Sequence, residues 1–249
     1  MQYTLVVSDM DGTLLRDDKR ISDRTAQAVQ RFEQAGGRFT IATGRGVAAM
    51  ERYMQQLKSR TPLLLLNGCI GYDPVTGDDI FRHELPHSVL EQIWPILLEH
   101  RLDIVVHGPR RGFIRGMNDV IAEHLMLDGI TVDEVPAMSP ATLTSVVKVL
   151  TMGAEPVLDR AEAAILAAGV PVKLVRSHTS YLEVLPPAGG KGEALSALLR
   201  HLQVPVAQSL AVGDFLNDVE MLQTAGLGVA MANAHPGLKA VARAETLSN

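Results

Sequence analysis

Short apolar runs alternate with amphipathic stretches over the first quarter of the chain. Leu5–Ser8, Arg38–Ala42 and Leu63–Leu66 are predicted as buried strands, and two stretches with helical spacing of apolar residues separate them. Ser22 is a typical helix N-cap, and Gly36-Gly37 would end the first of these helices. Strand, helix, strand, helix, strand at this spacing predicts right-handed crossovers and a parallel sheet. The predicted fold class is therefore α/β, with a Rossmann-like parallel-sheet core.

The pattern changes in the middle of the chain, where short strands come in pairs and mix with helices. Asp73–Asp78 has the composition of a hairpin turn. A helix is predicted after Pro86, and Pro95 inside it should cause a kink or an early break. The predicted strand pairs are Ile104–Val106 with Gly112–Ile114, and Val172–Arg176 with Tyr181–Leu185. We expect residues 84–186 to form an inserted α+β domain.

The alternation of apolar runs and amphipathic stretches returns after Pro186-Pro187. Lys191–Leu202 is predicted as a helix and Leu210–Val212 as a strand, followed by a short helix over Val219–Ala225 and a last strand over Gly228–Met231. We therefore expect residues 1–83 and 187–249 to form one α/β domain that the insertion interrupts.

Composition excludes several classes of protein. With 249 residues, 47% of them hydrophobic and 20% charged, the chain has the balance of an ordinary globular protein. A net charge of −5 argues against a nucleic-acid surface, which needs a basic stripe. Cys69 is the only cysteine, so no intrachain disulfide or cysteine-rich zinc site can form. No signal peptide and no apolar run of roughly 20 residues is present, so we expect a cytoplasmic protein without a membrane partner.

Two carboxylates, Asp9 and Asp11, follow the first predicted strand directly. Carboxylates this close repel each other unless they share a cation or a proton. The pair therefore indicates a divalent metal, acid–base chemistry, or both; alternatively, Asp and Gly only form a polar turn.

Polar side chains also follow the other core strands. They are Thr43, Asn67, Asp214, Asn217 and Asp218, and Lys191 begins a helix just after the insertion. Because the carboxyl ends of parallel strands meet at one edge of a sheet, these side chains can converge on one site. Hard oxygen ligands with few protein contacts suit Mg²⁺, which often binds a substrate phosphate as well.

Four segments resemble the motifs of the haloacid dehalogenase (HAD) phosphatases, in their order. The segments are Asp9-Met10-Asp11-Gly12-Thr13-Leu14, Thr43-Gly44-Arg45, Lys191-Gly192 and Gly213-Asp214-Phe215-Leu216-Asn217-Asp218. Asn67-Gly68, Ala230-Met231-Ala232-Asn233-Ala234 and the insertion after the third strand are similar to the Cof-like sugar-phosphatase branch. The resemblance implies a HAD fold in which the insertion acts as a cap domain.

The resemblance also implies a role for each motif residue. Asp9 would be the nucleophile that forms an aspartyl-phosphate, and Asp11 the general acid and base. Mg²⁺ would be held by Asp9, the main-chain carbonyl of Asp11 and Asp214, with Asp218 in support. The substrate phosphate would be held by Thr43, Gly44, Lys191 and Asn217, with Lys191 counted among the catalytic residues and Asn217 orienting it. Arg45 is expected at the surface or behind the site.

The function that follows is a Mg²⁺-dependent phosphomonoester hydrolase. It would act on small phosphorylated metabolites, sugar phosphates first, as a monomer or a homodimer. A phosphomutase that uses the same aspartyl-phosphate is the closest alternative, and a non-catalytic phosphometabolite sensor is another. In the insertion, Arg110, Arg111 and Arg115 either meet an anionic substrate or line a solvated turn. His107, His178 and Glu183 are weaker candidates for specificity residues.

Overall fold

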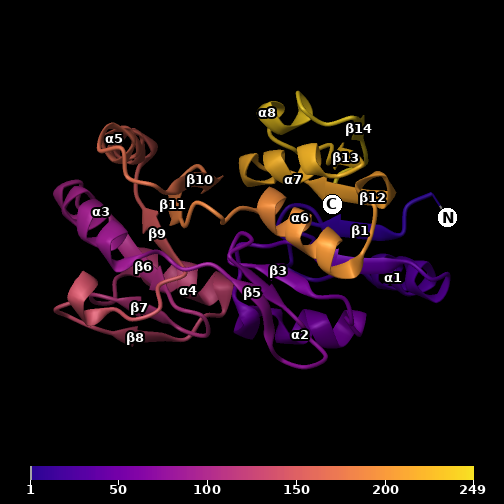
Figure 1. Cartoon of the computed structure of the whole chain (residues 1–249), viewed down its shortest axis with the longest axis horizontal. Helices are drawn as coiled ribbons and strands as arrows, with labels where there is room; N and C mark the ends of the chain where they lie inside the picture. The colour runs from indigo at the N-terminus through magenta and orange to yellow at the C-terminus, as the bar shows by residue number, and fades with distance from the viewer. Residues whose placement is uncertain (1) are drawn as a thin grey trace. The chain divides into compact units, whose positions relative to one another are not determined.

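The computed structural model describes residues 2–249, and residues 127 and 128 by their backbone only. The chain divides into two compact units, which Figure 1 shows in colours that follow the sequence. The core unit consists of Met1–Arg45, Met50–Phe81 and Gly190–Asn249. The inserted unit consists of Gly46–Ala49 and Arg82–Gly189.

The core unit is built on a parallel sheet with the strand order β14-β13-β12-β1-β2. The strands are β1 (Leu5–Ser8), β2 (Arg38–Ile41), β12 (Ser209–Gly213), β13 (Leu227–Ala230) and β14 (Ala244–Glu245). This parallel pairing confirms the predicted α/β fold class. Ser8 at the end of β1 is level with Ile41 on one side and Val212 on the other. The residues that follow these three strands therefore emerge at the same height along one edge of the sheet.

Helices of the core unit cover this sheet. They are α1 (Asp23–Gln34), α2 (Val47–Leu57, whose first three residues belong to the inserted unit), α6 (Lys191–Leu202), α7 (Val219–Thr224) and α8 (Pro236–Lys239), with short 3₁₀ turns at η2 (Val206–Gln208) and η3 (Leu216–Asp218). Ser22 caps α1 as predicted, because its side chain accepts a hydrogen bond from the Thr25 N–H at 3.1 Å. Leu195 of α6 and Met221 of α7 are fully buried in one cluster with Val7 of β1. This cluster fixes the start of α6 against the sheet.

The third predicted strand differs from expectation. β3 (Leu63–Leu65) joins β2 through a single parallel bridge, Ala42↔Leu64, and pairs antiparallel with β4 (Ile70–Tyr72), next to β5 (Asp79–Arg82). The physical reason is the turn after β3, where Leu66, Asn67 and Gly68 have φ values of 51°, 53° and 83°. This left-handed stretch reverses the chain, so β3 belongs to a separate three-stranded sheet.

The inserted unit contains a six-stranded sheet with the order β10-β11-β9-β6-β7-β8, antiparallel except for the parallel pair β7–β8. Its elements are α3 (His87–Glu99), β6 (Asp103–His107), β7 (Gly112–Ile114), α4 (Asp119–Asp128), β8 (Val132–Glu134), η1 (Pro140–Thr142), β9 (Lys148–Met152), α5 (Glu155–Ala167), β10 (Lys173–His178) and β11 (Tyr181–Leu185). The hydrophobic pattern did not predict β8, which is short and only partly buried.

The helix α3 does not end early at Pro95, so the expectation of a break there is wrong. It runs on to Glu99, and Trp94 and Leu97 on either side of the proline are buried at 5% and 0% exposure. Burial of such side chains stabilises by about 1.5 to 3 kcal/mol each, which offsets a cost of about 3 kcal/mol for proline inside a helix.

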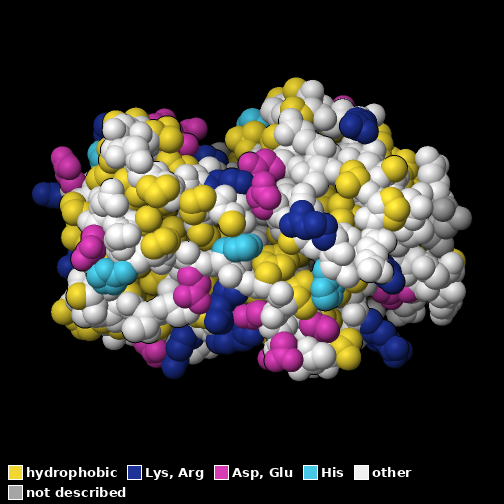
Figure 2. Space-filling model, viewed as in Figure 1, with side chains coloured by type: hydrophobic (Ala, Val, Ile, Leu, Met, Phe, Trp, Pro, Cys, Tyr) yellow, Lys and Arg dark blue, Asp and Glu magenta, His cyan; other side chains and the backbone are white. Residues whose placement is uncertain are grey.

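No helix in the part of the chain that the structure describes is long and apolar enough to cross a membrane. On the face that Figure 2 shows, Lys and Arg side chains are interspersed with Asp and Glu.

Candidate active site

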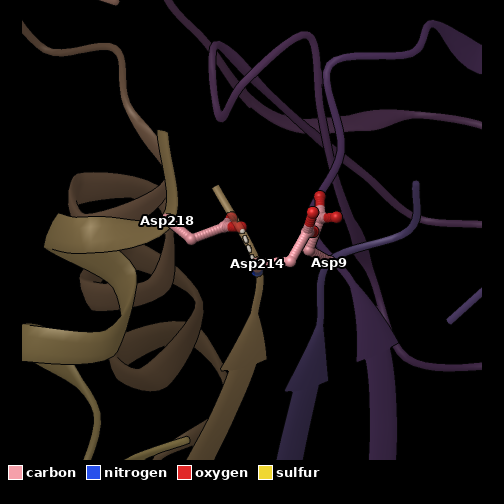
Figure 3. Close-up of side chains that lie close together, drawn as sticks. All are labelled: Asp9, Asp214 and Asp218. Atoms are coloured by element: carbon pink, nitrogen blue, oxygen red, sulfur yellow. Dashed lines mark hydrogen bonds between the residues drawn. The ribbon is translucent and has the colours of Figure 1, made fainter. Parts of the chain in front are cut away.

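Three aspartates gather at the carboxyl edge of the core sheet. Asp9 follows β1, Asp214 follows β12, and Asp218 ends η3. One carboxylate oxygen from each lies within 4.8 Å of the others. Figure 3 shows Asp9 and Asp214 side by side beyond the ends of their strands, with Asp218 reaching toward them from the segment that follows. The level register of β1 and β12 brings the first two together, and the Asp9 N–H donates to Val212 O at 2.9 Å.

Lys191 lies in the middle of this cluster. It is the first residue of α6, and its fully buried side chain places Nζ 2.5 Å from Asp9 Oδ1 and 2.6 Å from Asp218 Oδ1. Burial by itself would lower the pKa of Lys191, but the charges of Asp218 and Asp9 outweigh it and raise the pKa, so the ammonium stays charged. Asn217 instead donates to Asn67 Oδ1 at 3.1 Å. The expectation that Asn217 orients Lys191 is therefore wrong, because the Asp218 carboxylate does so.

Both carboxylate oxygens of Asp218 accept hydrogen bonds from other groups of the protein. Its Oδ1 accepts from Lys191, and its Oδ2 accepts from the N–H groups of Asp214 at 3.1 Å and Phe215 at 3.3 Å. A Cβ atom at Gly213 would lie 2.5 Å from this Oδ2, so the residue there has to be glycine. Asp218 thus holds Lys191 and the turn after β12 in place.

Asp214 is held by the segment that follows β1. Its Oδ1 accepts from the Thr13 hydroxyl at 2.8 Å. A Cβ atom at Gly12 would lie 2.3 Å from Asp214 Oδ2, and Gly12 has φ 81°, so only glycine leaves room for this carboxylate. The segment after β1 therefore packs closely against the segment after β12.

The cluster carries more negative than positive charge. Burial, the largest cause, raises the pKa of Asp9 well above its usual value; the Lys191 charge opposes this rise, and the charges of Asp218 and Asp214 add to it. Burial and the Asp218 charge likewise raise the pKa of Asp214. A bound cation would relieve this repulsion. The donor set consists of carboxylate oxygens, which fits a hard divalent metal.

Asp11 has two cations as partners. Arg45 donates to both of its carboxylate oxygens, Nε to Oδ2 and Nη2 to Oδ1, each at 2.7 Å, and Lys19 Nζ donates to Oδ1 at 3.0 Å. Burial would raise the pKa of Asp11, but the hydrogen bonds and charges of Arg45 and Lys19 lower it overall. The side chain of Arg45 is 5% exposed, so of the two positions expected for it, the structure has the one behind the site and not the one at the surface. Sequence reasoning missed Lys19, since nothing in its spacing marks it as a partner of Asp11.

Hydrogen-bond donors lie near the Thr43-Gly44 motif. Thr43 is buried, and its hydroxyl oxygen accepts from the Arg45 N–H at 3.2 Å. Asn67 is 1% exposed, and its amide Nδ2 has no hydrogen-bond partner among the described residues. A Cβ atom at Gly44 would lie 3.3 Å from that Nδ2. A buried donor without a partner costs about 1 to 3 kcal/mol, so an acceptor that reached this amide nitrogen would remove that cost.

The candidates in the inserted unit have partners of their own. Glu183 accepts from Lys148 Nζ at 2.7 Å, and both side chains are almost fully buried. Arg111 pairs with Asp133 at 2.8 Å with both side chains about half exposed, which favours the solvated-turn interpretation for that arginine. His107 is buried, and neither ring nitrogen has a hydrogen-bond partner among the described residues.

Comparisons with known proteins agree with this arrangement. The family model of the haloacid dehalogenase-like hydrolases matches residues 6–249. The HMP-PP phosphatase of Escherichia coli O6:H1 is 30% identical over 237 residues, which cover 95% of this chain and 86% of that protein. A haloacid dehalogenase-like hydrolase from Bacteroides thetaiotaomicron superposes with a TM-score of 0.85 at 26% identity, covering 99% and 94% of the two chains. A sugar phosphatase of HAD subclass IIB has the same fold, with a TM-score of 0.86 at 19% identity and coverage of 98% and 93%.

Proposed function

The chain belongs to the haloacid dehalogenase-like hydrolases, and we propose that it is a Mg²⁺-dependent phosphatase that acts through an aspartyl-phosphate on Asp9. The observation that carries the proposal is the environment of Asp9. Its carboxylate lies between the Lys191 ammonium and the carboxylates of Asp214 and Asp218. In the proposed role, Asp9 would be a nucleophile with one fixed cation beside it, in a cluster that needs a second cation.

Mg²⁺ would be held by the Asp9 and Asp214 carboxylates and the main-chain carbonyl of Asp11. Asp218, whose oxygens accept from Lys191 and two N–H groups, would support this set. When bound, Mg²⁺ supplies positive charge that lets an anionic nucleophile approach an anionic phosphate.

The reaction would proceed in two half-reactions, with Asp9 as the nucleophile and Asp11 as the acid and base. An Asp9 oxygen attacks phosphorus, the bond from phosphorus to the leaving oxygen breaks, protonated Asp11 gives that oxygen its proton, and an aspartyl-phosphate forms. Water then attacks the same phosphorus, Asp11 takes its proton, and Asp9 and inorganic phosphate are released. Thr43, Gly44, Lys191 and Asn217 would hold the phosphoryl oxygens. Asn67 Nδ2, which has no partner among the described residues, would join them.

We propose small phosphorylated metabolites, sugar phosphates among them, as the substrates. The names of the similar proteins, an HMP-PP phosphatase and a sugar phosphatase, support the class. We also propose that residues 84–186 act as a cap that excludes water during phosphoryl transfer, with residues 1–83 and 187–249 as the catalytic domain.

The test is phosphate release from p-nitrophenyl phosphate and a panel of sugar phosphates, with Mg²⁺ and with EDTA. Asp9→Asn should lower kcat by at least about 10⁴-fold, because the nucleophile is lost, and leave the circular dichroism spectrum unchanged. Asp17→Asn is the matched control, since this exposed carboxylate lies in the loop after the Asp9 motif. Metal-independent release, or an active Asp9→Asn protein, would contradict the proposal.

A further inference from the structure

Three segments of the candidate site meet at Asn67, in the turn after β3. The Asn67 N–H donates to Thr43 O at 2.8 Å, and the Asn67 carbonyl accepts from the N–H of Gly190, the residue before Lys191, at 3.0 Å. The side-chain Oδ1 of Asn67 accepts from Asn217 Nδ2 at 3.1 Å. Asn67 therefore has a hydrogen bond to each segment that carries a side chain expected to hold the phosphoryl group.

The backbone conformation at this position suits asparagine. Asn67 has φ 53°, in the left-handed region, between Leu66 at 51° and Gly68 at 83°. Asparagine and aspartate are enriched in this region among residues other than glycine, and glycine enters it without strain. The side chain at position 67 can therefore be changed to that of aspartate or glycine while the turn is kept.

The contact through Oδ1 fixes the direction of the Asn217 amide. A planar amide NH₂ group carries two hydrogens, so the one that Asn217 gives to Asn67 determines where the other one points. The acceptor itself is fixed, because Asn67 is 1% exposed and its backbone is bound on both sides to the segments of Thr43 and Lys191. The Asn217 amide is thus held at a set position relative to those two residues.

We propose that Asn67 is a positioning residue for phosphoryl transfer, which holds the Asn217 amide in line with Thr43 and Lys191 so that all three meet one phosphoryl group. This inference rests on the proposed phosphatase function and adds a positioning role to the contact through Asn67 Nδ2. Donors that are in place before the phosphoryl group arrives need no reorganisation in the transition state, whereas a misplaced donor contributes little to it.

The experiment measures kcat/KM for p-nitrophenyl phosphate with Mg²⁺ in a double-mutant cycle. Asn217→Ala should lower kcat/KM about 30-fold in the wild-type background, because a hydrogen bond to a charged phosphoryl oxygen is lost. In the Asn67→Gly background, which keeps the left-handed turn, the same change should cost less than about fivefold, since the Asn217 amide is no longer held there. The Ki of inorganic phosphate should show the same coupling.

A conservative variant and a matched control complete the design. Asn67→Asp keeps an acceptor for the Asn217 amide, so Asn217→Ala should again cost more than about tenfold in that background. Gln203→Gly removes an exposed amide side chain at φ 55° in the core unit and should leave the cost of Asn217→Ala unchanged. A cooperative urea transition in each variant shows that kcat/KM is measured on folded protein.

The outcomes separate the positioning role from the proposed function. An equal cost of Asn217→Ala in the wild-type and Asn67→Gly backgrounds would overturn the positioning role and leave the phosphatase standing. A cost in the Asn67→Asp background as small as that in Asn67→Gly would overturn it as well, because the acceptor is present there. Absence of phosphate release by the wild-type protein would overturn the proposed function and the positioning role with it.

Discussion

Each unit of the protein buries a lysine, and the two lysines have different surroundings. Lys191 in the core unit contacts Asp9 and Asp218, with Asp214 beside them. Lys148 in the inserted unit contacts Glu183, which also accepts from the Ser177 hydroxyl. Among the described contacts, the first cluster sets three carboxylates against one ammonium, whereas in the second the Lys148 ammonium meets the Glu183 carboxylate.

The difference in charge balance separates a reactive cluster from a structural one. In a buried pair of opposite charges, each charge compensates the other, and removing one partner leaves the other charge uncompensated. A cluster with surplus carboxylates has raised pKa values and binds a cation or a proton, which is typical of functional sites. We therefore interpret Lys191 as part of the chemistry and Lys148 as part of the architecture of its sheet.

Of the changes that compare the two lysine clusters, removing Lys191 should have the largest effect. Lys191→Met should lower kcat by about 10³-fold, roughly 4 kcal/mol, because a fixed charge next to the reacting phosphate is lost. Steady-state kinetics on p-nitrophenyl phosphate measures this, with the exposed Lys58→Met as the control. A kcat within twofold of the wild-type value would assign Lys191 a purely structural role.

Removing Lys148 should act on stability instead. Lys148→Met should lower the free energy of unfolding by about 3 kcal/mol, because it leaves Glu183 buried without its cation. The double variant Lys148→Met/Glu183→Leu should recover most of that loss, since no charge then stays buried. Urea unfolding checks both, and strictly additive losses would show that the two residues do not act as a pair.

Bound metal should stabilise the protein only through the cluster of Asp9, Asp214 and Asp218, where carboxylates outnumber cations. Mg²⁺ at 100 times its Kd should raise the free energy of unfolding by about 2.7 kcal/mol, and EDTA should reverse this. Thermal unfolding of the wild-type protein measures the shift. Asp214→Asn should reduce it, whereas Glu183→Gln should not. An equal shift in Asp214→Asn would place the ion elsewhere.

The smallest effect should come from His107 in the inserted unit. Its pKa lies well below 6.5, first because it is buried and then because Lys148 on β9 and His124 on α4 are close. Below pH 6.5 the unfolded chain binds a proton that the folded protein does not, so stability present above that pH is lost as pH falls. The loss is at most about 1.4 kcal/mol per pH unit.

Replacing the imidazole tests this dependence. His107→Leu should flatten the acid limb of stability in urea unfolding at pH 5, 6 and 7, and the exposed His201→Gln should leave it unchanged. An acid limb of wild-type steepness in His107→Leu would mean that another group is responsible.

The convergence of Asp9 and Asp214 could be predicted because it depends on short-range patterns. Apolar runs of four or five residues predict strands, and parallel strands put the next residue at a common edge. The HAD resemblance, which the family comparison confirms, added the order of the motifs. The same reasoning placed Lys191 at the start of its helix, where the structure has it.

The partners of these residues could not be predicted in the same way. Lys19 meets Asp11 only because the left-handed turn at Lys19 and the Tyr53 hydroxyl hold the loop. Arg45 is adjacent to Thr43 and Gly44 in sequence, but its burial against Asp11 follows from the packing of separate segments.

By itself, the amino-acid sequence determined the α/β class, the parallel direction of β1, β2, β12 and β13 and the residues at their ends, because these follow from local hydrophobic periodicity. Only the tertiary structure decided which charges pair. Asp218, not Asn217, holds Lys191, and Asn67 Nδ2 has no hydrogen-bond partner among the described residues. Side-chain pairing depends on the relative placement of loops far apart in the chain, to within the length of a hydrogen bond, and no local pattern encodes that distance.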